Sequence, residues 1–183
     1  MNERGGKRKS VTGVKKLVVL ALFTALSLVV FVVENQLPPL GVPGAKLGLA
    51  NIFSLSALVL YGPVEAVAVV LARTLLGSLI TGTVSALVYS LAAGMVAVAV
   101  SSLLVCFLLG RVSLVAASVA AAVTHNLTQN LLFVLLNNAP QMLAYLPYLA
   151  LIGLPSGALV GAVVTLLIKK LPEKTLLSVT DGG

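Results

Sequence analysis

Charged residues are almost absent from the middle of this 183-residue chain. Residues 17 to 168 include just five formal charges: Glu34, Lys46, Glu65, Arg73 and Arg111. In the whole sequence 9% of residues are charged and 59% are apolar, whereas a soluble domain has about 25% charged residues. The apolar residues are enough for roughly five or six membrane spans of about 20 residues. We therefore predict an integral membrane protein without a separate soluble domain.

Proline, glycine and polar residues divide the apolar sequence into six segments. We predict helices over residues 16–33, 47–60, 64–80, 84–109, 112–136 and 143–168, the second being short for a full crossing. The segment 34–45 contains three prolines, so we expect an ordered loop or a re-entrant stretch there, on the outer side of the membrane. Pro147 and Pro155 predict a bend or a late start in the last helix. The sequence thus predicts an all-α bundle of six transmembrane helices over residues 16–170, between a basic tail (1–15) and a second tail (171–183).

Basic residues flank the apolar region at both ends. Six of the twelve Lys and Arg residues precede it, and Lys169, Lys170 and Lys174 follow it. Because cytoplasmic flanks of membrane spans are enriched in Lys and Arg, we expect both termini in the cytoplasm and an even number of spans. Most of the net charge of +7 then serves to orient the chain in the membrane, and we expect no nucleic-acid partner.

Arg73 lies near the middle of a predicted span. An ionisable side chain at that depth costs about 2.5 to 3.5 kcal/mol on the insertion scale, so it needs a specific partner or a function. Gly77 follows four residues later on the same helix face, where a neighbour or a ligand could approach closely. Three interpretations remain open: a pair with Glu34 or with carbonyl groups, a contact to an anionic or carbonyl-bearing ligand, and a contact to a cytoplasmic partner.

A group of polar residues lies on the predicted helix 112–136, in the sequence THNLTQN. His125, Asn126, Gln129 and Asn130 are related by steps of three and four residues, so they form one stripe on an otherwise apolar helix. The stripe either joins helices through hydrogen bonds or forms a ligand-binding face, since amide and imidazole groups both donate and accept.

The segment PGAKLGLAN places Lys46 where a glycine-containing loop leads into a helix, with Asn51 about one turn inside. A helix N-terminus beside a lysine attracts anions, although a solvated lysine at the membrane interface also explains Lys46. Glu34, at the end of the first predicted helix, is either an interfacial acid or a counter-ion for Lys46 or Arg73. We include all three residues among the candidates for a ligand site.

Signatures of catalysis and of metal binding are missing from the sequence. It contains no GxxxxGK(S/T) loop, no DDxxD cluster, no GxSxG and no HExxH. One His and one Cys provide no set of metal ligands, and we expect Cys106 to be a small packed apolar residue. We therefore predict a protein that is not an enzyme and uses no metal or cofactor, so any ATP hydrolysis must come from a partner.

Five motifs carry a family resemblance: PGAKLGLAN, RTLLGSLITGT, SLAAG, THNLTQN and YLPYLALIGLPSG. In this order they resemble the membrane family called Gx transporter, or heptaprenyl diphosphate synthase component I, from the first predicted helix to the last. That family is similar to the substrate-binding S components of energy-coupling factor (ECF) transporters. The resemblance implies six helices, cytoplasmic termini, a substrate-covering loop at 34–45, and a place in the cytoplasmic membrane of a prokaryote.

The resemblance also implies partners. ECF S components contact a shared transmembrane T component through an AxxxA motif on the first helix, and Ala21 and Ala25 match that motif in ALFTALSL. Small residues at this spacing let helix backbones pack closely. The implied partners are a T component and ATP-binding subunits, together with a small-molecule ligand and membrane lipid.

The leading hypothesis is a non-catalytic S-component-like subunit that captures a small ligand from outside. We expect the ligand to contact a set of polar residues: Arg73, His125, Asn126, Gln129, Lys46, Asn51, Glu34 and Asn130. The alternative is a non-catalytic membrane scaffold for isoprenoid or quinone enzymes, such as a prenyl diphosphate synthase or a flavin-linked or quinone-linked redox enzyme.

Overall fold

The computed structural model describes residues 4–36, 47–82, 84–108 and 111–170, and the side chains of these residues except 4–12 and 84–86. This part of the chain forms six α-helices and one short 3-10 helix. The elements are α1 (Arg4–Gln36), α2 (Asn51–Tyr61), α3 (Pro63–Thr81), α4 (Val84–Leu108), α5 (Leu114–Asn137), η1 (Pro140–Tyr145) and α6 (Leu146–Lys170). The prediction of an all-α bundle of six helices is confirmed.

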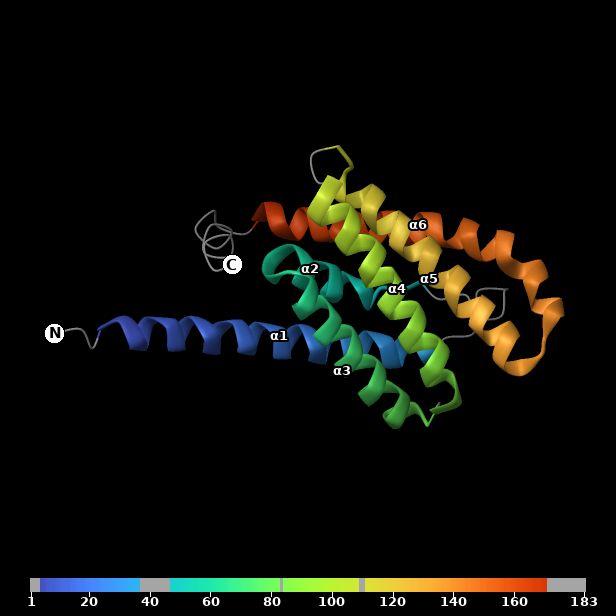
Figure 1. Cartoon of the computed structure of the whole chain (residues 1–183), viewed down its shortest axis with the longest axis horizontal. Helices are drawn as coiled ribbons and strands as arrows, with labels where there is room; N and C mark the ends of the chain where they lie inside the picture. Colours follow the sequence, from blue (N-terminus) through green and yellow to red (C-terminus); the bar gives the residue numbers. More distant parts are fainter. Residues whose placement is uncertain (1–3, 37–46, 83, 109–110, 171–183) are drawn as a thin grey trace.

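The helices run back and forth between two ends of the bundle (Figure 1). The Lys16 end holds the N-terminal part of α1, the turn between α2 and α3, the start of α5 and the end of α6. The Glu34 end holds the end of α1, the start of α2, the end of α3 and the turn between α5 and α6. At the Lys16 end, Lys16 Nζ forms a salt bridge with Glu65 Oε1 at 2.5 Å and lies over the Tyr61 ring, 5.8 Å from its centroid. These contacts hold the N-terminal part of α1 beside the turn between α2 and α3.

Five of the described helical segments are long and apolar enough to cross a membrane: α1, α3, α4, α5, and η1 with α6. α2 has 11 residues and is too short for a full crossing, as its sequence predicted. Large apolar side chains cover the outside of the bundle, with Leu17 69%, Val64 76% and Phe107 80% exposed. Cys106, which we expected to be packed, is also exposed. An apolar exterior of this extent suits a lipid environment rather than water.

The bounds of several helices differ from the prediction. α2 begins at Asn51 and not at residue 47, because the backbone at Gly48 has a φ of +66° and cannot be helical, so Asn51 is the first residue of α2 rather than about one turn inside it. α1 begins at Arg4 and not near residue 16, because Lys and Arg end an apolar run without ending a helix. It also continues through Glu34 to Gln36, and the rest of the predicted loop, residues 37–45, lies outside the described part of the chain. The late start of the last helix is confirmed, since η1 precedes α6 and Pro147 lies in the first turn of α6, where its missing N–H is tolerated.

α5 and α6 pack backbone against backbone. Three glycines of α6, each one turn apart, lie against three valines of α5: Gly153 on Val123, Gly157 on Val119 and Gly161 on Val115. A Cβ atom on these glycines would lie 2.9, 2.5 and 2.6 Å from the valine Cα atoms, which is closer than side chains allow. Small residues at a spacing of four produce such contacts in membrane bundles. The contact fixes the position of α5, which carries the polar stripe.

The short helix α2 lies inside the bundle. Its residues Leu55, Ala57 and Leu58 are at most 6% exposed. They belong to the core with residues of α3, α4 and α6, among them Val70 and Val160. Because α2 is both short and central, its first residues lie between the other helices.

Candidate functional site

Arg73 is the buried centre of a polar cluster. It lies in the middle of α3 and is 4% exposed. Its Nη2 donates to Oδ1 of Asn51 at 2.6 Å, and its Nη1 donates to Oγ of Ser27 at 3.3 Å. Its Nε has no hydrogen-bond partner among the described residues. The guanidinium therefore joins α1, α2 and α3, and its Nε–H can still donate to another acceptor.

Two side chains of α1 hold the start of α2 in place. The hydroxyl of Ser27 donates to the backbone oxygen of Ala50 at 3.0 Å, and Oε1 of Glu34 accepts from the backbone N–H of Leu49 at 2.9 Å. No salt bridge joins Glu34 to Arg73 in the described part of the chain, although the Glu34 charge partly balances that of the guanidinium through space. The acceptors of Arg73 are thus a neutral amide oxygen and a hydroxyl oxygen, and not the Glu34 carboxylate, which was one of the interpretations open from the sequence.

A cavity of about 20 Å³ lies beside Arg73, and we name it the Arg73 cavity. It is lined by Phe31, Glu34, Gly48, Ala50, Asn51, Arg73, Thr74, Ser90 and His125. Four of the predicted site residues meet here, although four helices or their ends supply them: Glu34 from α1, Asn51 from α2, Arg73 from α3 and His125 from α5. The space holds about one water molecule, so a larger ligand requires lining side chains to move.

The polar stripe of α5 divides into different environments. His125 lines the Arg73 cavity. Asn126, which is 4% exposed, donates from Nδ2 to the backbone oxygen of Leu149 in α6 at 3.2 Å. Gln129 and Asn130 are 7% and 5% exposed, and their amide oxygens have no hydrogen-bond partner in the described part of the chain. A buried acceptor without a donor costs about 1 to 3 kcal/mol, so these two oxygens are suited to a donor from a bound molecule.

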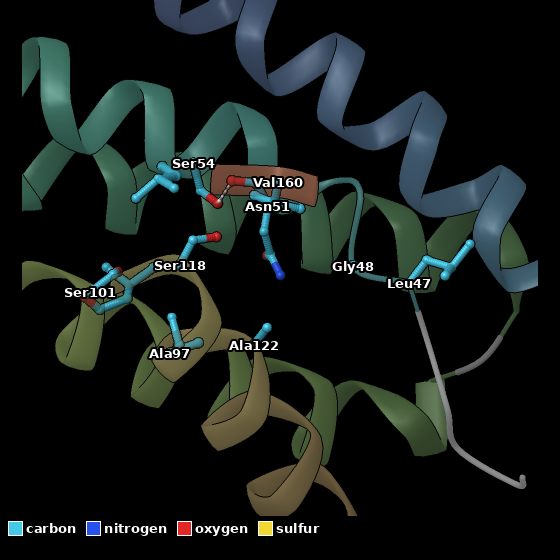
Figure 2. Close-up of a pocket in the computed structure, with 12 residues that line it drawn as sticks. Leu47, Gly48, Asn51, Ser54, Ala97, Ser101, Ser118, Ala122 and Val160 are labelled. Carbon is cyan, nitrogen blue, oxygen red and sulfur yellow. Dashed lines mark hydrogen bonds between the residues drawn. The ribbon is translucent and has the colours of Figure 1, made fainter. Parts of the chain in front are cut away.

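A second cavity, of about 30 Å³, lies between α2, α4, α5 and α6 (Figure 2). We name it the serine cavity because its polar lining includes Ser54, Ser101 and Ser118. It shares Gly48 and Asn51 with the Arg73 cavity. Gly48 has a φ of +66°, which glycine adopts without strain. A Cβ there would also lie only 3.0 Å from Nδ2 of Asn51, so a larger residue would crowd that side chain. The two cavities are neighbours that meet at Asn51.

Five predicted residues line neither cavity: Asn126, Gln129 and Asn130 of the polar stripe, and the alanines at positions 21 and 25. Ala21 and Ala25, the predicted docking pair, are exposed on α1. Lys46 lies outside the described residues, so its predicted contact with an anion is not placed. Within residues 4–36, 47–82, 84–108 and 111–170, no group of three or more His, Cys, Asp or Glu side chains is arranged to hold a metal ion.

Sequence reasoning missed the serines of both cavities. Ser and Thr are common in membrane helices because their hydroxyls bond to the carbonyls of their own helix, as Ser56 does to the oxygen of Ile52 at 2.7 Å. A serine alone therefore carries little signal. The usable signal is spacing, since Ser118, His125 and Gln129 share one face of α5 and extend the polar stripe toward the Lys16 end.

A family match adds to this geometry. The sequence profile of the heptaprenyl diphosphate synthase component I family matches residues 23–167. This range includes every residue that lines the two cavities and at least part of every helix, while Ala21 lies just before it. No curated protein and no solved structure matches the chain.

Proposed function

The chain belongs to the heptaprenyl diphosphate synthase component I family, and we propose that it is a non-catalytic membrane subunit that captures a small ligand from outside the cell. In this proposal it acts like an ECF S component, and uptake depends on a T component and on ATP-binding subunits. The ligand binds at the Arg73 cavity. The proposed location is the cytoplasmic membrane of a prokaryote, with both termini in the cytoplasm.

The observation that supports ligand capture is the state of Arg73. A charge inside a membrane bundle is expensive, and a purely structural arginine is expected to have acceptors for its donors. Here Arg73 is 4% exposed and lines a cavity, and its Nε has no acceptor among the described residues. An anionic or carbonyl-bearing group in that cavity would supply the acceptor.

The distribution of cations supports access from the Glu34 end. The Lys16 end carries Lys15, Lys16, Arg111, Lys169 and Lys170. Since Lys and Arg are enriched on the cytoplasmic side, the Glu34 end would face the outside. The Arg73 cavity is nearer to that end, because Phe31 and Glu34 at the end of α1 line it.

The exposed surface of α1 around Ala21 and Ala25 is the proposed docking site for a T component. Both alanines are exposed, and the neighbouring Leu22 and Leu26 are 55% and 42% exposed. The alanines would let a helix of the partner approach closely, while the leucines would add apolar contact. This part of the proposal also depends on the ECF resemblance.

The family description supports a second candidate function. A component I of a prenyl diphosphate synthase would be one subunit of a larger assembly, and this chain could serve such an enzyme, or a flavin-linked or quinone-linked redox enzyme, as a non-catalytic membrane scaffold. In that case the polar groups around Arg73 would bind the headgroup of a prenyl lipid or quinone.

Identification of the bound molecule separates the two candidates. The protein is purified in detergent from cells that contain its natural ligand pool, and its extract is analysed by mass spectrometry. A water-soluble molecule with an anionic or carbonyl group, present in nearly equimolar amount, is the result that capture predicts. A prenyl lipid or quinone favours the scaffold, and a preparation that contains neither contradicts both.

A further inference from the structure

Asn51 separates the two cavities. Its Oδ1 is held by Arg73 at 2.6 Å, which turns the other end of the carboxamide away from Arg73. Figure 2 shows the amide nitrogen of Asn51 pointing toward the part of α5 that carries Ser118 and Ala122. One side chain thus contributes its oxygen to the Arg73 cluster and its nitrogen to the serine cavity.

The two cavities lie in series along the bundle. On α4, which runs from the Glu34 end to the Lys16 end, Ser90 lines the Arg73 cavity and Ser101 lines the serine cavity. On α5, which runs the opposite way, His125 lines the Arg73 cavity and Ser118 lines the serine cavity. Both helices therefore place the serine cavity deeper than the Arg73 cavity when the bundle is entered from the Glu34 end.

The chemistry of the two cavities differs. The Arg73 cavity contains a cation and an anion, whereas no described residue that lines the serine cavity is charged. In the serine cavity, Ser54 and Ser101 use their hydroxyl protons on the oxygens of Asn51 and Val98, which leaves their lone pairs as acceptors. Ser118 is 4% exposed, and its hydroxyl points toward Asn51 (Figure 2). These groups suit an uncharged part of a molecule that carries hydroxyl, amide or carbonyl groups.

We propose that the Asn51–Arg73 hydrogen bond separates the Arg73 cavity from the serine cavity, and we name this contact the partition. An anionic group of the ligand breaks it by taking the place of the Asn51 oxygen on Arg73. Hydrogen bonds between two charged groups are stronger than those between a charged group and a neutral amide, so an anion competes well for the guanidinium. Once Asn51 is released, the two small cavities become one longer site. The ligand is then a molecule with an anionic end at Arg73 and an uncharged, hydrogen-bonding end among the serines.

This inference rests on the proposed capture function, but it is tested without the natural ligand. The probes are two small thiol reagents of similar size, anionic sulfonatoethyl methanethiosulfonate and cationic trimethylammonioethyl methanethiosulfonate. In a Cys106→Ser background, Ser118→Cys places a thiol in the serine cavity, and Ser90→Cys places the matched control thiol in the Arg73 cavity. Labelling rates are measured by intact-protein mass spectrometry on the full chain in detergent.

Each labelling rate is divided by the rate of the same reagent with a small free thiol, because a thiolate reacts faster with the cationic reagent. On this relative scale the partition predicts that the anionic reagent labels the Ser118→Cys protein faster than the cationic one, and that Arg73→Gln removes this preference. Adding Asn51→Ala is expected to raise the labelling rate at position 118 by about tenfold or more, the effect of losing one hydrogen bond to a charged group. The rate at position 90 should change little, which also shows that the variant is folded. Asn51→Asp keeps an oxygen for Arg73, so labelling at position 118 should be no faster than with Asn51.

Equal relative rates for the two reagents at position 118 would overturn the inference. So would an Asn51→Ala effect at position 118 no larger than at position 90, or a rate with Asn51→Asp as high as with Asn51→Ala. These failures are distinct from failure of the proposed function, because a protein purified without any bound molecule contradicts capture and leaves the labelling rates unaffected.

Discussion

Oδ1 of Asn51 accepts a hydrogen bond from Nη2 of Arg73 at 2.6 Å, and this contact joins the first residue of α2 to the middle of α3. Ser27 of α1 adds the second acceptor at 3.3 Å. A cation buried among apolar helices is thus stabilised by neutral oxygens from two different helices. The arrangement explains how Arg73 is accommodated in the bundle while its Nε can still donate a hydrogen bond to a bound molecule.

Ser27→Ala should lower stability. Ser27 accepts from Arg73 and donates to the oxygen of Ala50, so its removal leaves a buried charged donor without that acceptor. We expect a loss of about 1 to 3 kcal/mol in the free energy of unfolding, measured by denaturation in detergent. Thr24→Ala is the control, because Thr24 bonds to Leu20 within its own helix. An equal effect of the two substitutions would show that the Ser27 contacts contribute nothing specific.

Gly157→Ala should also destabilise the bundle, for a steric reason. A Cβ at Gly157 would lie 2.5 Å from the Cα of Val119, and backbone cannot move aside as a side-chain tip does. We expect a cost of about 1 to 3 kcal/mol and a lower midpoint of thermal unfolding. Ala162→Val adds apolar volume at an exposed position of the same helix and should leave the midpoint unchanged. A stable Gly157→Ala protein would mean that α5 and α6 separate easily.

The number and order of the helices follow from the sequence. Apolar runs divided by Gly and Pro turns define six helices, and the structure has six in its described part. The start of α1 was predicted wrongly because hydropathy locates the membrane boundary, whereas Lys and Arg continue a helix well. The glycine contacts of α6 were not predicted, although Gly153, Gly157 and Gly161 at a spacing of four provide the signal.

The candidate site was partly predictable. Rare polar residues in an apolar chain identified Glu34, Asn51, Arg73 and His125, which meet around one cavity. Their partners could not be assigned from sequence, because the acceptor of a buried donor depends on how helices far apart in the chain pack. For this reason the side chains that accept directly from Arg73 are Asn51 and Ser27, and not Glu34.

Asn126 and Gln129 should respond differently to apolar substitution. Asn126 donates to the oxygen of Leu149, so Asn126→Leu removes a contact between α5 and α6, with an expected cost of about 0.6 to 1.7 kcal/mol in unfolding experiments. Gln129→Met keeps the volume and removes an amide whose buried oxygen has no described partner, so stability should stay the same or rise. If Gln129→Met destabilises as much as Asn126→Leu, Gln129 is a structural residue.

The proposed docking site predicts a loss of complex formation. Ala21→Trp with Ala25→Trp should prevent co-purification with a T component, because two indoles block close approach of a helix. The bound ligand should be retained, since neither residue lines a cavity. Val29→Trp with Val33→Trp is the matched control, with the same spacing on the same helix at positions 59% and 53% exposed. Loss of the complex in both pairs, or in neither, counts against docking at Ala21 and Ala25.

Ligand capture at Arg73 is tested most directly by the amount of small molecule that co-purifies with the protein, measured per mole by mass spectrometry in three versions of the chain. Arg73→Gln removes the buried guanidinium, and Arg111→Gln removes an exposed one as the control. The account predicts that Arg73→Gln lowers the bound amount by about tenfold or more, while Arg111→Gln retains the wild-type amount. An Arg73→Gln protein that is folded and carries as much ligand as the wild type would contradict it.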